Sequence, residues 1–234
     1  MLVQAAQTTA ETDFMLGLAE EHDFIAGVVG WVDLADDASV AVIERWATTS
    51  PKLKSLRPML QDLPDDDWIR TAPRRAVLDA MKRTGLRFDA LVMPRHLEAL
   101  LSFVRANPSL PVVIDHAAKP CLAQGWNGEW PERWRRGMAE LAREPQVVCK
   151  LSGLLTEASP EQCRDPVATL RPVWDTLLET FGPKRLMWGS DWPVLTLVAG
   201  YADWVNASEV LIGELSRSEQ VCVWGDCAAK VYGV

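Results

Sequence analysis

Short apolar runs rich in β-branched residues alternate along this chain with longer amphipathic segments. The apolar runs predict seven strands, at residues 2–3, 25–32, 53–60, 88–93, 111–115, 146–151 and 185–188. The amphipathic segments predict helices at residues 11–23, 40–47, 74–84, 97–105, 132–143, 168–181, 201–215 and 219–231. Strands that alternate with helices favour right-handed βαβ units and a parallel sheet.

Polar residues gather just after the predicted strands. In chain order they are Gln4, Asp33, Arg57, Gln61, Arg95, His96, Asp115, His116, Lys150, Ser152, Ser190 and Asp191. In a (β/α)8 barrel the carboxyl ends of the strands form the rim that carries the active site. A doubly wound sheet also binds ligands at its strand ends, but no GxGxxG or Walker-type loop follows any strand here. We therefore expect an α/β barrel with seven visible strands, one fewer than a complete barrel.

The composition narrows the class of protein and its partners. The chain has 234 residues, of which 48% are hydrophobic and 24% charged, as in ordinary globular proteins. Its net charge of −8 argues against binding nucleic acid or an anionic membrane. No signal-peptide pattern and no apolar stretch of transmembrane length occurs, so we expect a cytoplasmic protein. The five cysteines form no CxxC pair and favour reduced thiols.

Asp191 and His116 are the candidate catalytic residues. Asp191 ends the segment MWGSD, and a period of two places it on the same face as Met187 and Gly189. A carboxylate beside apolar walls becomes more basic and suits a general base that takes a proton from water. The alternative is an N-cap with turn chemistry from Ser190 and Pro193. His116 could bind a metal, stabilise an oxyanion, or serve only as a structural hydrogen-bonding group.

Four further polar residues are candidate substrate ligands. Arg57 and Gln61 bound a short apolar run, and Arg57 suits either a substrate carboxylate or an ion pair with Asp62 or Asp65. Lys119 precedes a proline and either pairs with a substrate carboxylate or stays solvated. Lys150 lies late in an apolar strand, shares a face with Ser152, and needs a partner, which is a neighbouring carboxylate or a ligand.

Six segments together resemble the amidohydrolase 2 family of TIM-barrel enzymes, and within it the sugar-lactone lactonases such as fuconolactonase and rhamnonolactonase. They are GWVDL (30–34), LRPMLQD (56–62), PRHL (94–97), VIDHAAKP (113–120), CKLSGL (149–154) and MWGSDWP (187–193). The resemblance covers nearly the whole chain in the family's order. It implies a hydrolase that opens a sugar-acid lactone with water, with Asp191 as the general base, His116 after the sixth barrel strand, and Arg57, Lys119 and Trp192 around the substrate.

One departure from the family concerns its metal. Family members begin with a strand that carries an HxH motif, whose histidines bind a divalent metal or the substrate, whereas this sequence has no HxH. We therefore expect a single barrel domain over residues 1–234, shortened at its N-terminus relative to the family. His116 and Asp191 would be the remaining ligands of a zinc or manganese ion, short of the usual three or so. The protein would then use one divalent metal or none.

Two alternatives to the lactonase remain open from the sequence. One is a metal-dependent decarboxylase or hydratase of the same superfamily. The other is an inactive barrel fragment. An absent first strand would leave two open sheet edges, which favour association with further copies of the chain.

Overall fold

The computed structural model describes all residues, 1–234, and shows an α/β fold. The strands are β1 (Leu2–Val3), β2 (Val28–Gly30), β3 (Leu53–Leu56), β4 (Arg87–Ala90), β5 (Val112–Ile114), β6 (Val147–Leu151) and β7 (Leu186–Trp188). The helices are α1 (Thr9–Glu21), α2 (Ser39–Thr49), α3 (Trp68–Thr71), α4 (Arg75–Arg83), α5 (Leu97–Ala106), α6 (Trp130–Ala142), α7 (Pro166–Phe181), α8 (Tyr201–Ile212), α9 (Arg217–Val221) and α10 (Cys227–Tyr232). No helix is both long enough and apolar enough to cross a membrane.

The seven strands form one sheet in the order of the sequence, β1 to β7. The pairs β1–β2, β2–β3, β3–β4 and β6–β7 are parallel. This confirms the predicted parallel α/β arrangement with seven strands.

The strands are shorter than the apolar runs that predicted them. The run 53–60 ends as a strand at Leu56, because Pro58 has no N–H to donate and a 3-10 turn begins at Leu60. The predicted helix 219–231 is divided by a π-helical segment, Cys222–Asp226, and α3 was not predicted. Element boundaries depend on local hydrogen bonds that an apolar pattern does not encode.

The chain folds as two compact units, and each unit is made of segments that are separate in the sequence. The first contains Met1–Leu91, Glu98–Val113 and Tyr232–Val234, and the second contains Val92–Leu97 and Ile114–Val231. Each unit is described by itself below. The prediction of one domain over residues 1–234 stays a prediction.

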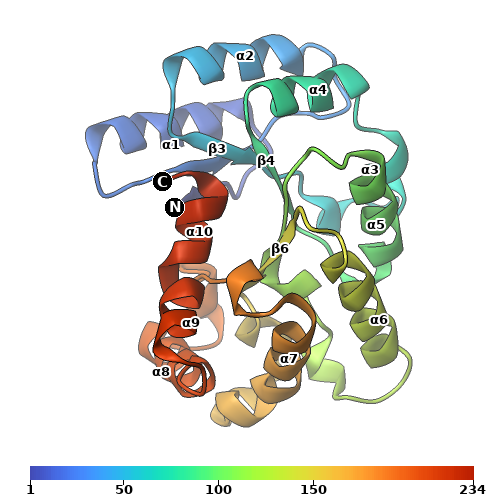
Figure 1. Ribbon diagram of the computed structural model, residues 1–234, viewed down its shortest axis with the longest axis vertical. Helices are drawn as coiled ribbons and strands as arrows, with labels where there is room; N and C mark the ends of the chain where they lie inside the picture. Colours follow the sequence, from blue (N-terminus) through green and yellow to red (C-terminus); the bar gives the residue numbers. More distant parts are fainter. The chain divides into compact units, whose positions relative to one another are not determined.

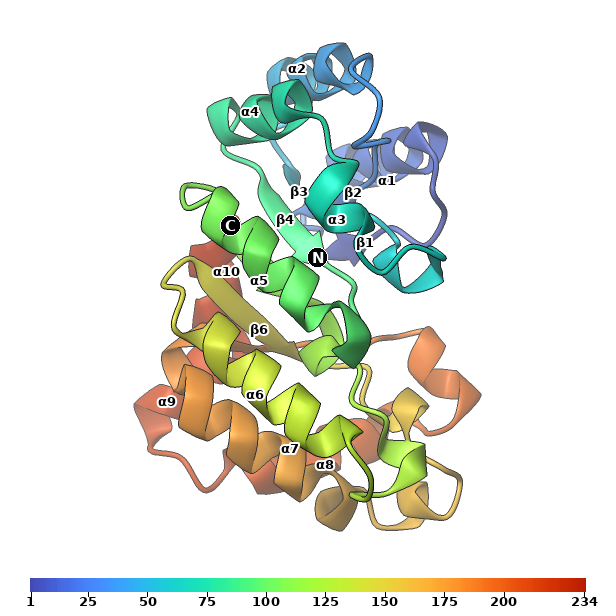
Figure 2. The same ribbon diagram turned by 90° about the vertical axis from the view of Figure 1, so that its right-hand side faces the viewer.

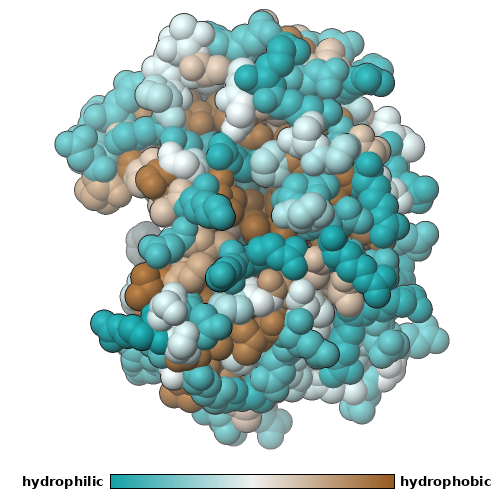
Figure 3. Space-filling model, viewed as in Figure 1, coloured by the Kyte–Doolittle hydropathy of each residue, from teal (hydrophilic) through white to brown (hydrophobic).

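In the first unit, helices α1, α2 and α4 accompany strands β1 to β4, and α2 and α4 lie side by side (Figure 1). Val28, Val29 and Phe88 are fully buried in its core, and Phe88 packs on Phe103 at a ring-centroid distance of 4.8 Å. Hydrophilic residues cover the outer side of α4 (Figure 3). Burial of the apolar side chains supplies the main stabilisation of such a unit.

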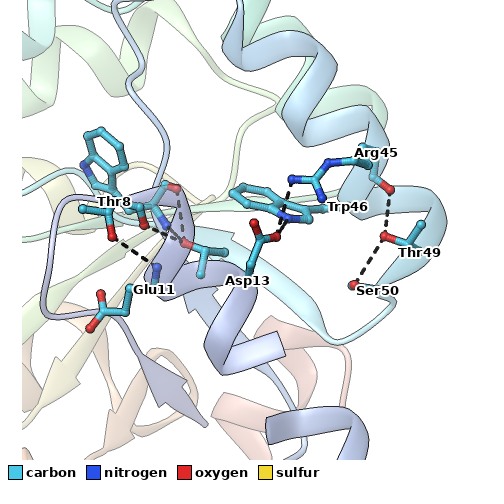
Figure 4. A network of polar contacts seen from close by, with 9 residues as sticks. Thr8, Glu11, Asp13, Arg45, Trp46, Thr49 and Ser50 are labelled. Carbon is cyan, nitrogen blue, oxygen red and sulfur yellow. Dashed lines mark hydrogen bonds and ion pairs between the residues drawn. The ribbon is translucent and has the colours of Figure 1, made fainter. Parts of the chain in front are cut away.

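A polar network fixes the start of α1 and joins it to α2 (Figure 4). The Thr8 hydroxyl caps α1 by accepting from the backbone N–H of Glu11 at 3.1 Å. Asp13 accepts from the indole N–H of Trp46 at 2.6 Å and from Arg45 at 3.4 Å. A side-chain cap of this kind contributes about 1 kcal/mol.

In the second unit, α6 and α7 lie side by side (Figure 2). Trp134 of α6 and Trp174 of α7 are fully buried. Asp165 caps α7 by accepting from the backbone N–H of Ala168 at 3.1 Å, and Pro166 occupies the first turn of that helix, where no N–H is needed. These helices hold β6 and β7, whose carboxyl ends lead into the site residues.

Candidate active site

His116 lies in an unusual left-handed turn directly after β5. Four consecutive residues that are not glycine, His116 to Lys119, have φ values of +52°, +49°, +59° and +49°. Each left-handed residue with a Cβ costs roughly 1–2 kcal/mol. Such strain persists only where the surroundings hold it, and it concentrates at functional sites. The turn therefore makes this strand end a candidate site.

The middle of the turn is held by its surroundings. Ala117 and Ala118 are fully buried, and the indole N–H of Trp134 donates to the carbonyl of Ala117 at 2.8 Å. The Ala117 backbone also hydrogen-bonds the thiol of Cys149 on β6, whose pKa is raised chiefly by burial. Within the turn, the backbone N–H of Lys119 donates to the carbonyl of His116 at 2.8 Å. The turn is thus tied both to α6 and to the sheet.

The imidazole of His116 faces two oxygen groups. Its Nδ1 lies 2.9 Å from the hydroxyl of Ser152, and its Nε2 lies 3.7 Å from the carboxylate Oδ1 of Asp191. The second distance exceeds that of a direct hydrogen bond but is well within electrostatic range. Both side chains are about seven-eighths buried, at 13% exposure each. The structure therefore brings together the two predicted catalytic residues, which are 75 positions apart in the sequence.

Asp191 reaches the site in a different way from the one predicted. Strand β7 ends at Trp188, and Asp191 has φ +54°, so it is not the last inward residue of an extended strand. It is not an N-cap either, because the following 3-10 turn is capped at Pro193. Its backbone carbonyl accepts from the N–H of Leu195 at 2.9 Å. The left-handed backbone, and not the strand period, directs the carboxylate toward His116.

Two mostly buried ion pairs lie in the same unit. Lys119 pairs with Glu157 at 2.6 Å, so of its two predicted alternatives the solvated one does not hold. Lys150 pairs with Asp115 at 2.7 Å, which confirms its need for a carboxylate partner. Asp115 directly follows β5, and its carboxylate thus contacts the next strand, β6. Each pair compensates the charge of its lysine and lowers the cost of burial.

Arg57 and Gln61 belong to the first unit. Arg57 is 8% exposed and its guanidinium donates to the backbone carbonyl of Gln4, while the side-chain amide of Gln4 donates back to the carbonyl of Arg57 at 2.8 Å. The backbone N–H of Gln61 donates to the carbonyl of Leu91 at 3.1 Å. Gln4, also noted at a strand end, is thus part of the support of Arg57.

The remaining histidines have structural surroundings. His96 is buried and its Nδ1 accepts from the backbone N–H of Met93 at 3.0 Å, in agreement with a position at the start of α5. His22 is exposed and stacks on Phe24. Trp192, next to Asp191, has 64% of its surface exposed. An exposed indole beside a candidate base offers an apolar platform to a ligand.

Several residues around the site were not singled out by the sequence. Glu157 follows β6 within a 3-10 turn, and its partnership with Lys119 could be found only in three dimensions. Gly153 has φ +60°, and a Cβ at this position would lie 2.4 Å from Nδ1 of His116. A glycine directly after a strand is a signal of close approach, which the motif CKLSGL contains.

The donor set falls short of a complete metal site. Nowhere in residues 1–234 do three or more His, Cys, Asp and Glu side chains lie close enough together to hold an ion. His116 and Asp191 offer two donors, whereas a catalytic zinc site uses three protein ligands. The residues of this chain therefore do not by themselves fit the expected zinc or manganese ion.

The sequence matches known proteins along its whole length. Residues 2–234 match the family model Amidohydro_2, described as amidohydrolase. The chain belongs to the amidohydrolase family. An L-fucono-1,5-lactonase of Burkholderia ambifaria is 43% identical to it, and the alignment covers 100% of this chain and 76% of the relative. An L-fucono-1,5-lactonase of Burkholderia multivorans is 36% identical, over 99% of the chain and 79% of the relative.

Solved structures confirm the fold of this amidohydrolase-family chain. A crystal structure of an amidohydrolase from Burkholderia multivorans with bound HEPES matches with a TM-score of 0.88 at 35% identity, over 99% of this chain and 82% of that one. A second crystal structure, with bound zinc, matches with a TM-score of 0.87 at the same identity and coverage. The expected TIM-barrel class of fold is confirmed, with seven strands in this chain.

Proposed function

We propose that this chain hydrolyses the lactone ring of a sugar acid. The observation that carries the proposal is that the imidazole of His116 faces the carboxylate of Asp191 at 3.7 Å. Both side chains are mostly buried, and they lie just beyond the carboxyl ends of β5 and β7. The L-fucono-1,5-lactonase of Burkholderia ambifaria, 43% identical over the whole chain, supports a sugar 1,5-lactone as the substrate class. An acid–base pair at a rim of this kind suits the addition of water to a carbonyl.

In the proposed reaction Asp191 acts first, as the general base. Its carboxylate takes a proton from a water molecule, and the water oxygen forms a bond to the lactone carbonyl carbon. The N–H of His116 donates to the carbonyl oxygen, which becomes an oxyanion in the tetrahedral intermediate. Collapse of the intermediate breaks the ring C–O bond, and the departing ring oxygen takes the proton that Asp191 received. Water is consumed and a hydroxy acid is released.

The other candidate residues bind the sugar in this proposal. Trp192 offers its exposed indole to the apolar face of the ring. Lys119 and Lys150 each donate one ammonium N–H to a substrate hydroxyl. Each lysine also pairs with a carboxylate, which lowers the cost of burying its charge. That Arg57 and Gln61 bind the substrate stays a prediction from the sequence.

Bound zinc is present in the crystal structure of the related amidohydrolase from Burkholderia multivorans. In this chain His116 and Asp191 supply two donors and no third His, Cys, Asp or Glu completes the group. No step of the proposed reaction is therefore assigned to a metal.

A substrate screen tests the proposal. The purified chain is incubated with L-fucono-1,5-lactone, other sugar 1,5-lactones and simple aliphatic lactones, and acid release is followed in a pH-stat. We expect kcat/KM to be highest for the sugar lactones, because Trp192 and the lysines contact the sugar. If no lactone is opened faster than in buffer alone, the proposed function is wrong.

A further inference from the structure

Ser152 and Gly153, which directly follow β6, lie against the imidazole of His116. The Ser152 side chain is buried, at 3% exposure, and its hydroxyl is 2.9 Å from Nδ1. A Cβ on Gly153 would lie 2.4 Å from Nδ1 and 2.7 Å from Cγ of the ring. Real Cβ atoms do not approach other atoms so closely, so only glycine leaves room for this ring position.

Gly189, just after β7, plays the same part for Ser152. A Cβ at Gly189 would lie 3.1 Å from the Cβ of Ser152, which is tighter than an ordinary van der Waals contact. The backbone N–H of Gly189 donates to the carbonyl of Leu151 at 3.0 Å, so this glycine is fixed against β6. The serine is therefore confined between Gly189 and the imidazole.

The contact at Nδ1 determines what Nε2 can do. Nε2 lies 3.7 Å from the carboxylate of Asp191, and a proton on Nε2 is favoured beside a negative charge. Neutral histidine carries one proton, and the hydrogen bond at one nitrogen decides which nitrogen holds it. With the proton on Nε2, Nδ1 is an acceptor, and the Ser152 hydroxyl is the group placed to donate to it.

We propose that Ser152 and Gly153 are positioning residues for His116. Gly153 leaves the space that the ring occupies, and Ser152 donates to Nδ1, which holds the ring in one orientation with its N–H at Nε2. That N–H is the group that polarises the lactone carbonyl, so the inference rests on the proposed function in its catalytic part. Ser152 itself touches no reacting atom.

The tautomer can be read without any substrate. The chain has three histidines, His22, His96 and His116, so the protein with 15N-labelled imidazoles gives a simple long-range 1H–15N spectrum. The His116 signals are assigned by their loss in His116→Gln. At a pH where the imidazoles are neutral, we expect the Nε2–H pattern for His116 in the unmodified chain, and a loss of that single pattern in Ser152→Ala.

Matched variants separate positioning from general damage. Ser208→Ala also removes a buried serine hydroxyl, one that accepts from the indole of Trp188 at 2.9 Å, and should leave the His116 signals unchanged. Gly153→Ala should displace the ring. Gly85→Ala carries a similar backbone penalty, since Gly85 has φ +72°, but nothing lies within 4 Å of its Cβ, and it should leave the ring in place.

Kinetics give the second measurement. On L-fucono-1,5-lactone, Ser152→Ala should lower kcat about 10- to 100-fold with little change in KM, in the range of a lost orienting contact. Unchanged His116 signals together with unchanged kcat in Ser152→Ala would overturn the proposal. If the unmodified chain opens no lactone, the proposed function fails, while the tautomer spectra still decide whether Ser152 positions the ring.

Discussion

At the scale of single residues, two buried thiols make the stability of the fold sensitive to alkaline pH. Burial raises the pKa of Cys227 to about 12 and raises that of Cys149 as well, from a value of 9.0 for an exposed thiol. Between pH 9 and 12 the unfolded chain therefore holds fewer protons on these thiols than the folded chain does, and the free energy of unfolding falls as the pH rises.

Urea unfolding at pH 8 and pH 10 measures this effect. We expect a lower midpoint at pH 10, and a smaller decrease in Cys227→Ala, which removes one of the two titrating groups. Cys222→Ala is the control, because this partly exposed thiol lies in the π-helical segment that directly precedes Cys227. An equal decrease in all three proteins would show that other groups cause the alkaline loss.

At the scale of elements, the left-handed turn after β5 depends on α6. The indole N–H of Trp134 donates to the carbonyl of Ala117, whereas the indole N–H of Trp174, on a second fully buried tryptophan, has no hydrogen-bond partner. Trp134→Phe should cost about 1–3 kcal/mol more than Trp174→Phe in denaturant unfolding, because only the former leaves a buried carbonyl without its donor. It should also lower kcat by loosening His116. Equal losses of stability in the two variants would contradict this account of the turn.

The elements also show what the sequence can predict. Apolar runs located all seven strands, because burial on both faces of a parallel sheet imposes a continuous apolar pattern. The turn HAAK could not be predicted, since nothing in a local pattern indicates four left-handed residues that are not glycine. The sequence placed Asp191 and His116 on the same rim. The left-handed backbone that directs Asp191 toward His116 could not be predicted, again because no local pattern indicates it.

At the scale of the whole molecule, neither compact unit is a continuous stretch of chain. Residues 98–113 and 232–234 belong to the first unit, although residues of the second unit precede them in the sequence. Within the first unit, the hydroxyl of Tyr232 donates to the buried carboxylate of Asp89 at 2.7 Å. A domain that folds alone is usually one stretch of chain that ends in exposed linkers, and neither unit is such a stretch. We therefore predict one domain with a single cooperative transition. Tryptophan fluorescence and far-ultraviolet circular dichroism should give the same urea midpoint, and two separated midpoints would contradict it.

The central claim is that Asp191 activates the water that opens a sugar lactone. The most direct measurement is kcat/KM for L-fucono-1,5-lactone in Asp191→Asn, with Asp203→Asn as a control because Asp203 caps α8 through the N–H of Gly200 at 3.0 Å. Loss of a general base typically lowers the rate about 10²- to 10⁴-fold. The account predicts a loss in that range for Asp191→Asn and a change of less than about twofold for Asp203→Asn. Full activity in Asp191→Asn would contradict it.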